Sequence, residues 1–475
     1  MKKDTTLIVI SIPFTRNLRY LSSSKILDRL REDYDVLLVG PQFKDEALRA
    51  EFAGPRTSFW AFGLQREQLS VFARCVYELS EVLRRCGYYF RFRNKGTGFY
   101  WNYALWLRLD AVGKNVAPVK WRALIRILAP LGYFRRAWML IDRIFGGLIF
   151  NNGGLLEHTN NYDHVVVVQT ANWGYQERFL AYSARQKKFK SILVPYTTDQ
   201  IIINGYLMGS YDMVCPQGPI EELYLKQHHN LPANRIYPLG MLWRRNIEDF
   251  QEKHAVKLAA KEIQKEQVIL YAGMSQESFP RESEFQAINR IIGAIHDGVL
   301  PKIKLVYRPV VSDLADLDVI MQRFGGKNLV EIQVPQAVFI GVNESSGSSV
   351  RAQINEYLED IAEVDLLIMS RTTTMLFDAL HFDIPCIANF ADPSGMLDEM
   401  KFTTTYIEED ETLRPLKSMP VIHSNDDLIN QIKETLKLPL VTSQMKKQLF
   451  LAWDYENKDY VNGFIELIEG LRPIK

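Results

Sequence analysis

The chain has few cysteines, no long apolar run and almost no net charge, and each absence excludes a class of protein. Only four of its 475 residues are cysteine, and they are scattered without a Cys-x-x-Cys pair. A disulfide framework or a structural zinc site is therefore not expected, and a reducing cytosol fits. No stretch of 18 uninterrupted apolar residues occurs, so no segment is expected to span a membrane. The formal net charge of +1 identifies no partner.

Several nucleotide- and metal-binding signatures are also missing. No Gly-x-Gly-x-x-Gly follows the first apolar run, and no Gly-x-x-x-x-Gly-Lys-Ser/Thr or Gly-x-Ser-x-Gly occurs, which counts against NAD enzymes, P-loop ATPases and serine hydrolases. The eight histidines form no His-x-His or His-Glu-x-x-His pattern, so no metal site and no cofactor are expected.

What the chain does have is a regular alternation of strand-like and helical segments, typical of parallel sheets with crossover helices. The pattern starts again after a charged helix at about 248–265, with a boundary expected near 241–247. The fold class predicted is α/β, with two Rossmann-like doubly wound lobes facing a cleft. The strands are expected at 7–12, 36–39, 165–169, 191–195, 213–215 and 236–239, then at 268–272, 304–307, 338–340, 366–369 and 386–388.

Residues 357–390 form the most informative segment, which predicts helix, buried strand, hydroxyl-rich turn, helix and short strand. The strand at 366–369 runs into Ser370, Arg371, Thr372, Thr373 and Thr374. Such a turn offers backbone N–H groups and hydroxyls to a phosphate. Asp378 follows about two helical turns later, where a carboxylate can accept hydrogen bonds from sugar hydroxyls. Helix capping by one threonine is the plainer alternative.

This segment resembles the C-terminal nucleotide-binding half of GT-B glycosyltransferases, most closely bacterial enzymes that build capsule, O-antigen or teichoic-acid-type polymers. The resemblance rests on Asp365 before the strand, the threonine turn, Asp378-Ala379, and the Ile-Pro-Cys-Ile stretch at 384–387. It implies a nucleotide-activated sugar as co-substrate and a last helix, at 443–475, that crosses back to the first lobe. Retaining members often carry two glutamates eight positions apart. Ser370 and Asp378 stand there instead, which leans toward inversion.

The layout gives a first, acceptor lobe at 1–243, with an insert at 84–150, and a donor lobe at 244–442. Two further donor-lobe segments follow expected strands. Gly273 and Ser275 lie in a turn where the backbone can approach a phosphate or sugar closely. Arg308 ends the strand at 304–307, and its guanidinium suits phosphate oxygens. Arg308 and Arg371 are thus the candidates for the departing phosphate, although a plain turn and a surface salt bridge remain alternatives.

Transfer with inversion needs a base for the acceptor hydroxyl, and two clusters in the first lobe follow expected strands. Asp199 is the first candidate and Glu177 the second. Asn172 and Trp173 would hold the acceptor, the tryptophan by stacking on a sugar face. A capping or solvated carboxylate is the alternative for either acid.

The insert has an unusual composition. Between 84 and 143, thirteen lysines and arginines oppose two aspartates, a net charge of +11, and aromatic residues are interleaved with them. Such a segment is typical of a surface that docks on anionic headgroups. A structural helical insert with core aromatics and a single-stranded nucleic-acid surface are the alternatives. No nucleic-acid-binding motif accompanies the segment, so nucleic acid is not the expected partner.

The function predicted is glycosyl transfer from a nucleotide-activated donor to a hydroxyl of a lipid-linked or growing surface glycan. The enzyme would be metal-independent and peripheral on the inner, cytoplasmic face of a bacterial cell membrane. Three alternatives stay open: a CDP-polyol phosphotransferase of the teichoic-acid type, a sugar-nucleotide epimerase of the same fold, and a non-catalytic glycan- or membrane-binding scaffold.

Overall fold

The chain divides into two compact units. Unit 1 consists of residues 1–242, 409–411 and 452–475, and unit 2 consists of residues 243–408 and 412–451. The structure is a computed structural model. It describes residues 5–471 except 14–16, 19–20, 22–24, 65–67, 93–134, 151–153, 173, 197–198, 203–204, 261–265, 275–279, 312–313, 327–329, 335–349, 371–372, 374, 392–418, 438–439 and 456–457.

Unit 1 is built on a six-stranded parallel sheet in the order β3-β2-β1-β4-β5-β6. The central strands are runs of valine, leucine and isoleucine buried on both sides, as expected where helices cover both faces. The strands are β1 (Thr6–Ser11), β2 (Asp35–Val39), β3 (Thr57–Trp60), β4 (His164–Gln169), β5 (Lys190–Leu193) and β6 (Met213–Val214).

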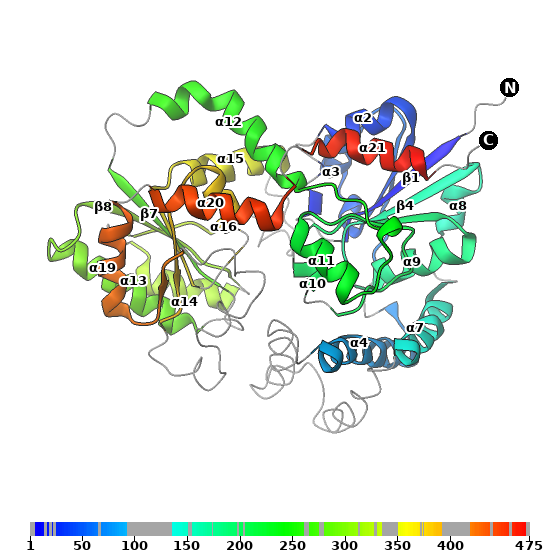
Figure 1. Ribbon diagram of the computed structural model, residues 1–475, viewed down its shortest axis with the longest axis horizontal. Helices are drawn as coiled ribbons and strands as arrows, with labels where there is room; N and C mark the ends of the chain where they lie inside the picture. The colour runs from blue at the N-terminus through cyan, green and yellow to red at the C-terminus, as the bar shows by residue number, and fades with distance from the viewer. Residues whose placement is uncertain are drawn as a thin grey trace. The chain divides into compact units, whose positions relative to one another are not determined.

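The helices of unit 1 enclose this sheet (Figure 1). One core joins alternate residues of β1, β2 and β4 to apolar side chains of α4, α7 and α9, among them Tyr77, Phe145 and Phe179. The helices are α2 (Ile26–Asp33), α3 (Glu46–Phe52), α4 (Val71–Phe92), α7 (Arg135–Phe150), α8 (Leu155–Thr159), α9 (Tyr175–Lys187), α10 (Asp199–Ile202), α11 (Pro219–Gln227) and α21 (Tyr460–Gly470).

Unit 2 repeats the plan, with strand order β12-β11-β10-β7-β8-β9 and parallel pairing throughout. The strands are β7 (Gln267–Ala272), β8 (Ile303–Arg308), β9 (Val330–Ile332), β10 (Leu366–Met369), β11 (Cys386–Asn389) and β12 (Val421–Ile422). The helices are α12 (Leu242–Ala260), α13 (Arg281–His296), α14 (Leu314–Phe324), α15 (Val350–Ala362), α16 (Met375–His381), α19 (Asn425–Thr435) and α20 (Leu440–Trp453).

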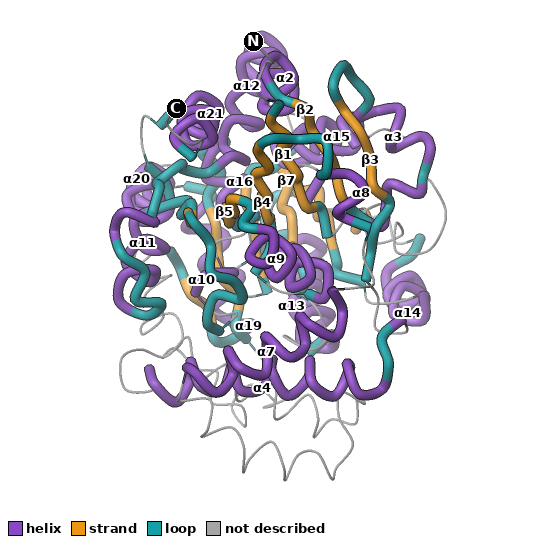
Figure 2. The backbone as a smooth tube through the Cα atoms, turned by 90° about the vertical axis from the view of Figure 1, so that its right-hand side faces the viewer, coloured by secondary structure: helices purple, strands orange, loops and turns teal. Residues whose placement is uncertain are grey.

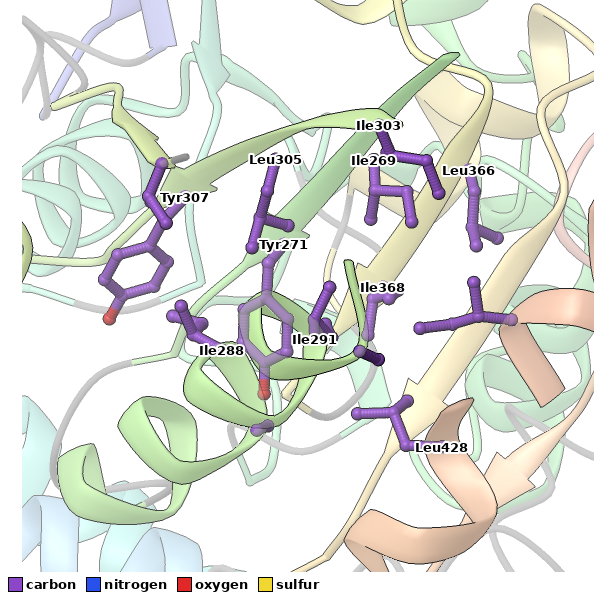
Figure 3. Packing of buried hydrophobic residues seen from close by; sticks show 14 of the residues in the cluster. Ile269, Tyr271, Ile288, Ile291, Ile303, Leu305, Tyr307, Leu366, Ile368 and Leu428 are labelled. Atoms are coloured by element: carbon purple, nitrogen blue, oxygen red, sulfur yellow. The ribbon is translucent and has the colours of Figure 1, made fainter. Parts of the chain in front are cut away.

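Alternation along the strands creates the core of unit 2. Ile269 and Tyr271 of β7 point to the same side as Leu305 and Tyr307 of β8, where α13, α14 and α19 pack. Figure 3 shows Ile288 and Ile291 of α13 beside these strand residues. The fold-class prediction of two doubly wound parallel α/β units is therefore confirmed. Among the helices that the structure describes, none is long and apolar enough to cross a membrane.

The differences from the expected elements fall at sheet edges and at the chain's end. The edge strands β3, β9 and β12 were not predicted, and 236–239 makes only an isolated bridge from Ile236 to Val214. The strand expected at 338–340 lies outside the described residues. The tail forms two helices, α20 and α21, where one was expected. Asp459 accepts hydrogen bonds from Val461 N and Asn462 N and so begins the second helix.

The insert is partly core. Arg84 is fully buried and donates hydrogen bonds to Glu81 and to the carbonyl of Tyr206. Tyr88 is buried and its ring stacks on that of His229. These two residues therefore cannot belong to an exposed docking surface, and for them the alternative of a structural insert holds. Residues 93–134 of the insert lie outside the described residues.

Candidate functional site

Two of the predicted donor-binding residues, Gly273 and Arg308, lie where strands of the unit 2 sheet end, and Asp378 lies in the helix α16 that follows β10. Because β7, β8, β10 and β11 run parallel, their carboxyl ends meet at one edge of the sheet. Gly273 follows β7, Arg308 ends β8, and Ser370 follows β10. Ligands of open α/β sheets bind at this edge.

The turn after β7 is built on a buried carboxylate. Glu284 of α13 accepts hydrogen bonds from Met274 N (2.7 Å), from Tyr307 Oη (2.6 Å) and from Arg281 Nη1 (2.6 Å). A Cβ on Gly273 would lie 2.7 Å from Glu284 Oε2. Burial raises the pKa of Glu284, against the opposing effect of the Arg281 guanidinium. A side chain at position 273 would clash with Glu284, so glycine is required there. The hydrogen bond between Met274 N and Glu284 fixes the backbone of the turn.

Arg308 is held over an aromatic ring. Its Cζ lies 4.9 Å from the centre of the Tyr357 ring, and its Nη1 donates to Gln333 (3.3 Å) and to Asp360 (3.4 Å). Burial raises the pKa of Asp360, while the charge of Arg308 opposes this rise. The guanidinium has weak, long contacts to both oxygens, so a phosphate could compete for it.

Asp378 is joined to the same tyrosine. Its Oδ2 accepts a hydrogen bond from Tyr357 Oη, and its Oδ1 accepts one from Trp243 Nε1 at 2.5 Å. The residue is 5% exposed. Arg308, Tyr357 and Asp378 thus form one connected set.

The threonine turn is only partly described. Thr373 Oγ1 accepts a hydrogen bond from Met375 N at 3.2 Å, so this threonine caps α16. Ser275, Arg371, Thr372 and Thr374 lie outside the described residues, and their predicted roles stay predictions.

A buried hydrogen-bond centre ties the strands together beneath this edge. Tyr271 Oη accepts from Ser370 Oγ at 2.9 Å and from Asn389 Nδ2 at 3.2 Å, and all three side chains are buried. The centre links β7 to the ends of β10 and β11, so it fixes the strand ends that carry the candidate residues.

In unit 1, Glu177 is fully buried at the start of α9. Its carboxyl oxygens accept from Ser11 Oγ (2.5 Å) and from Gln169 Nε2 (2.6 Å). Burial raises the pKa of Glu177 to about 8, and these two hydrogen bonds only partly oppose the rise. A carboxyl that is buried and protonated at neutral pH is poorly placed to take a proton from an acceptor, so Asp199 remains our candidate base. Asp199 begins α10.

Asn172 has an internal role. Its Oδ1 accepts from Met208 N at 2.9 Å, and its backbone N–H donates to Gln200 Oε1 at 2.9 Å. The side chain therefore ties two loops together, where we predicted a contact to the acceptor. Trp173, its predicted partner, lies outside the described residues.

Two contact residues were missed at the sequence level. Tyr357 stands three positions before Asp360 on α15, within the segment that carried the resemblance, but a tyrosine on a helix gives no specific signal. Trp243 lies 135 positions from Asp378, and no local pattern joins them. Among the described residues, no group of three or more histidine, cysteine, aspartate or glutamate side chains could hold a metal ion.

Comparison with known proteins shows the fold. No family model and no curated protein sequence matches the chain. A putative UDP-N-acetylglucosamine 2-epimerase from Listeria monocytogenes matches in structure with a TM-score of 0.52 at 12% identity, covering 98% of this chain and 96% of that one. MnaA of S. aureus, solved with UDP, gives 0.52 at 10% identity, with 98% and 96% covered.

A third structure extends the likeness. The UDP-GlcNAc 2-epimerase from Neisseria meningitidis, bound to UDP-GlcNAc, gives a TM-score of 0.51 at 11% identity, covering 98% of this chain and 99% of that one. These matches span both units, so the chain has a two-lobe GT-B-like fold, as the resemblance implied. At such identities the likeness concerns the fold alone.

Proposed function

We propose that the protein is a glycosyltransferase that binds a nucleotide-activated sugar at the carboxyl edge of the unit 2 sheet. The observation that carries the proposal is the connected set of Arg308, Tyr357 and Asp378. It places a cation, an aromatic ring and a carboxylate together at the edge where α/β sheets bind ligands. A nucleotide diphosphate presents the matching groups: phosphates, a base and ribose hydroxyls.

Each donor-side residue has a role in this proposal. Arg308, with Arg371, neutralises the departing phosphate, and the turns at Gly273–Ser275 and Thr372–Thr374 donate hydrogen bonds to it. Asp378 accepts a hydrogen bond from a ribose hydroxyl. Charge from arginines and backbone dipoles removes the need for a metal ion.

On the acceptor side, Asp199 is proposed to deprotonate a hydroxyl of a lipid-linked or growing glycan, and the transfer is proposed to invert the anomeric centre. The enzyme is proposed to act peripherally at the inner face of the cell membrane. Three apolar residues of α7, Leu140, Ile144 and Leu148, are exposed, which favours an acceptor held at a membrane because a water-soluble substrate would not require them.

A sugar-nucleotide epimerase is the second candidate. It is favoured by the full-length match to epimerase structures, one of which was solved with UDP-GlcNAc. Epimerisation would use the same nucleotide site and no acceptor. Two alternatives remain. A CDP-polyol phosphotransferase would bind a cytidine nucleotide, and a non-catalytic scaffold would bind no nucleotide.

The first test is thermal unfolding with UDP, GDP, CDP, CMP and dTDP. A nucleotide present at 100 times its dissociation constant stabilises by about 2.7 kcal/mol. We expect one nucleotide to raise Tm for the wild type and for Asp426→Ala, an exposed acid of α19 that serves as control. Asp378→Ala and Asp378→Asn should show a much smaller rise. A panel without any shift would refute the proposal and favour the scaffold.

The second test separates transfer from epimerisation. The nucleotide sugar identified by binding is incubated with and without a polyprenyl-linked glycan acceptor, and the products are resolved by chromatography. A transferase releases nucleotide only when acceptor is present. Formation of a C2-epimeric nucleotide sugar without acceptor would establish the second candidate in its place.

A further inference from the structure

The helix α7 is held to unit 1 by one face. Asp142 binds Arg178 of α9 at 2.8 Å, and Phe145 packs on Tyr77 of α4, with ring centres 5.1 Å apart. Gly146 lies directly against the ring of Tyr182, which leaves no space for a side chain. Figures 1 and 2 show α4 and α7 side by side. Positions 142, 145 and 146 thus define the inner face of α7.

The opposite face of α7 is exposed and apolar. Leu140, Ile144 and Leu148 are 58%, 47% and 38% exposed. Residues four apart are offset by only about 40° around a helix, so these three side chains form one stripe. By the same geometry the stripe lies about 160° to 240° from Asp142, so Leu140 and Ile144 are on the side away from the inner face and Leu148 is at the border, about 60° from Phe145.

An ordinary surface helix carries polar residues on that side. At the end of the hairpin where α7 finishes, Val71 and Phe72 of α4 are also exposed, at 68% and 64%. The hairpin is antiparallel, because Tyr77 meets Phe145 while Ser80 meets Asp142. Five large apolar side chains are therefore exposed on these two helices, which is more than scattered single residues would give.

An exposed arginine on α7 and the basic sequence that precedes this helix indicate what covers the stripe. Arg143 is exposed beside Leu140 and Ile144. The chain that enters α7, residues 93–134, carries seven lysines and arginines against one aspartate, a net charge of +6. An apolar helix face with an exposed arginine, preceded in sequence by a basic segment, is typical of a helix that lies in a membrane interface, where arginine reaches the headgroups while apolar side chains enter the acyl region.

We propose that the face formed by Leu140, Arg143, Ile144 and Leu148 is a membrane-docking surface for anionic phospholipid. If a second copy of this chain covered the face, the positive charges of the two copies would repel each other, so a dimer contact is disfavoured. The surface goes beyond the proposed transfer reaction, since it assigns the membrane contact to one helix face. It would bring unit 1 to the surface where a lipid-linked acceptor is held.

The test is co-sedimentation with vesicles of phosphatidylglycerol and phosphatidylcholine, compared with vesicles of phosphatidylcholine alone. We expect the wild type to bind the anionic vesicles, and Leu140→Ser/Ile144→Ser to bind at least tenfold more weakly. The matched control is Val319→Ser/Met321→Ser, which changes two residues of α14 with similar exposure, 50% and 47%. It should bind as the wild type does. Arg143→Glu should weaken binding to anionic vesicles.

The outcomes against the proposal are equally definite. A wild type that does not sediment with anionic vesicles would overturn it, as would a Leu140→Ser/Ile144→Ser variant that binds undiminished. If the wild type is a dimer by light scattering and this variant a monomer, a second copy covers the stripe. Nucleotide-induced stabilisation is measured on every variant. The proposed nucleotide site does not include α7, so this measurement tests the folding of each variant and the proposed function independently of vesicle binding.

Discussion

Glu177 is the residue whose titration should be visible in the stability of the whole protein. Its folded pKa of about 8 lies well above the ordinary 4.5. Between these values the folded state keeps a proton that the unfolded state has released. The contribution to stability is therefore full below about pH 4.5, falls as the pH rises to about 8, and is constant above that. The slope is about 1.4 kcal/mol per pH unit.

Glu177→Gln should remove that slope. Glutamine has the same shape and cannot ionise, and Gln169 Oε1 has no hydrogen-bond partner among the described residues, so it could accept from the new amide. We expect the free energy of unfolding of Glu177→Gln, measured with urea at pH 5, 6, 7 and 8, to fall less steeply with pH than that of the wild type. The difference in slope should correspond to about one proton. Parallel curves for the two proteins would show that Glu177 titrates normally.

Gly273 tests the turn beneath the proposed donor site. In Gly273→Ala, the new Cβ would lie 2.7 Å from Glu284 Oε2. Three hydrogen bonds hold Glu284 in place, so we expect a loss of about 1–3 kcal/mol in stability and a weaker nucleotide response. The matched control is Gly293→Ala in α13, where the new Cβ would meet no neighbouring atom of the described residues within 4 Å. It should stabilise the protein by up to ~1 kcal/mol. Equal effects would refute the steric argument.

At the same scale, sequence reasoning could propose Arg308 and Asp378 as donor-site residues because strand ends and the spacing of the motif are local signals. It did not identify Tyr357 and Trp243, which contact Asp378 from α15 and α12. It also assigned Asn172 to the acceptor, whereas its amide bonds Met208 and the Gln200 backbone carbonyl. In the sequence, an asparagine after a strand looks the same whether its side chain binds a ligand or forms hydrogen bonds between two loops.

At the scale of elements, a buried ion cluster joins α4, α7 and α9. Arg178 of α9 binds Glu81 of α4 and Asp142 of α7, and its side chain is 2% exposed. Burial raises the pKa of Asp142, and the nearby guanidiniums of Arg178 and Arg84 oppose this rise. Removing one partner of a buried pair leaves an uncompensated charge.

We therefore expect Asp142→Ala to destabilise the protein by about 3 kcal/mol, measured by urea unfolding. The comparison is Glu32→Ala, which breaks the exposed pair with Arg29 on α2 and should change stability by less than ~0.5 kcal/mol. A loss for Asp142→Ala as small as that for Glu32→Ala would mean that Glu81 alone satisfies Arg178.

The elements themselves were predictable where burial dictates composition. Central strands such as β4 and β10 are continuous apolar runs, because helices cover both of their faces. The edge strands β3 and β9 are partly exposed and short, so no apolar run marks them. Between α20 and α21, Asp454 accepts a hydrogen bond from Met241 N across 213 positions of sequence, a contact that no local pattern marks.

At the scale of the molecule, two periods of strand–helix alternation sufficed to predict two sheets, because only parallel sheets with crossover helices accommodate that order. The membership of the C-terminal residues could not be read from alternation. It rests on long-range contacts such as Tyr455 Oη to Glu222 and the packing of α21 beside α2, which place 452–475 in unit 1.

This assignment leads to a prediction about unfolding, since each unit has its own core. Phe464 of α21 and Leu428 of α19 are both buried, one in unit 1 and the other in unit 2. In calorimetry we expect two transitions. Phe464→Ala should lower only the unit 1 transition, by about 3–5 kcal/mol of that unit's stability, and Leu428→Ala only the other, by about 2–5 kcal/mol.

The nucleotide then identifies the donor unit independently of any variant of the site. It should raise the transition that Leu428→Ala lowers and leave the transition that Phe464→Ala lowers unchanged, because ligand binding stabilises only the unit that binds it. A nucleotide that raised the Phe464-sensitive transition would place the donor site in unit 1. A single transition lowered equally by both substitutions would show that the two units unfold as one cooperative body.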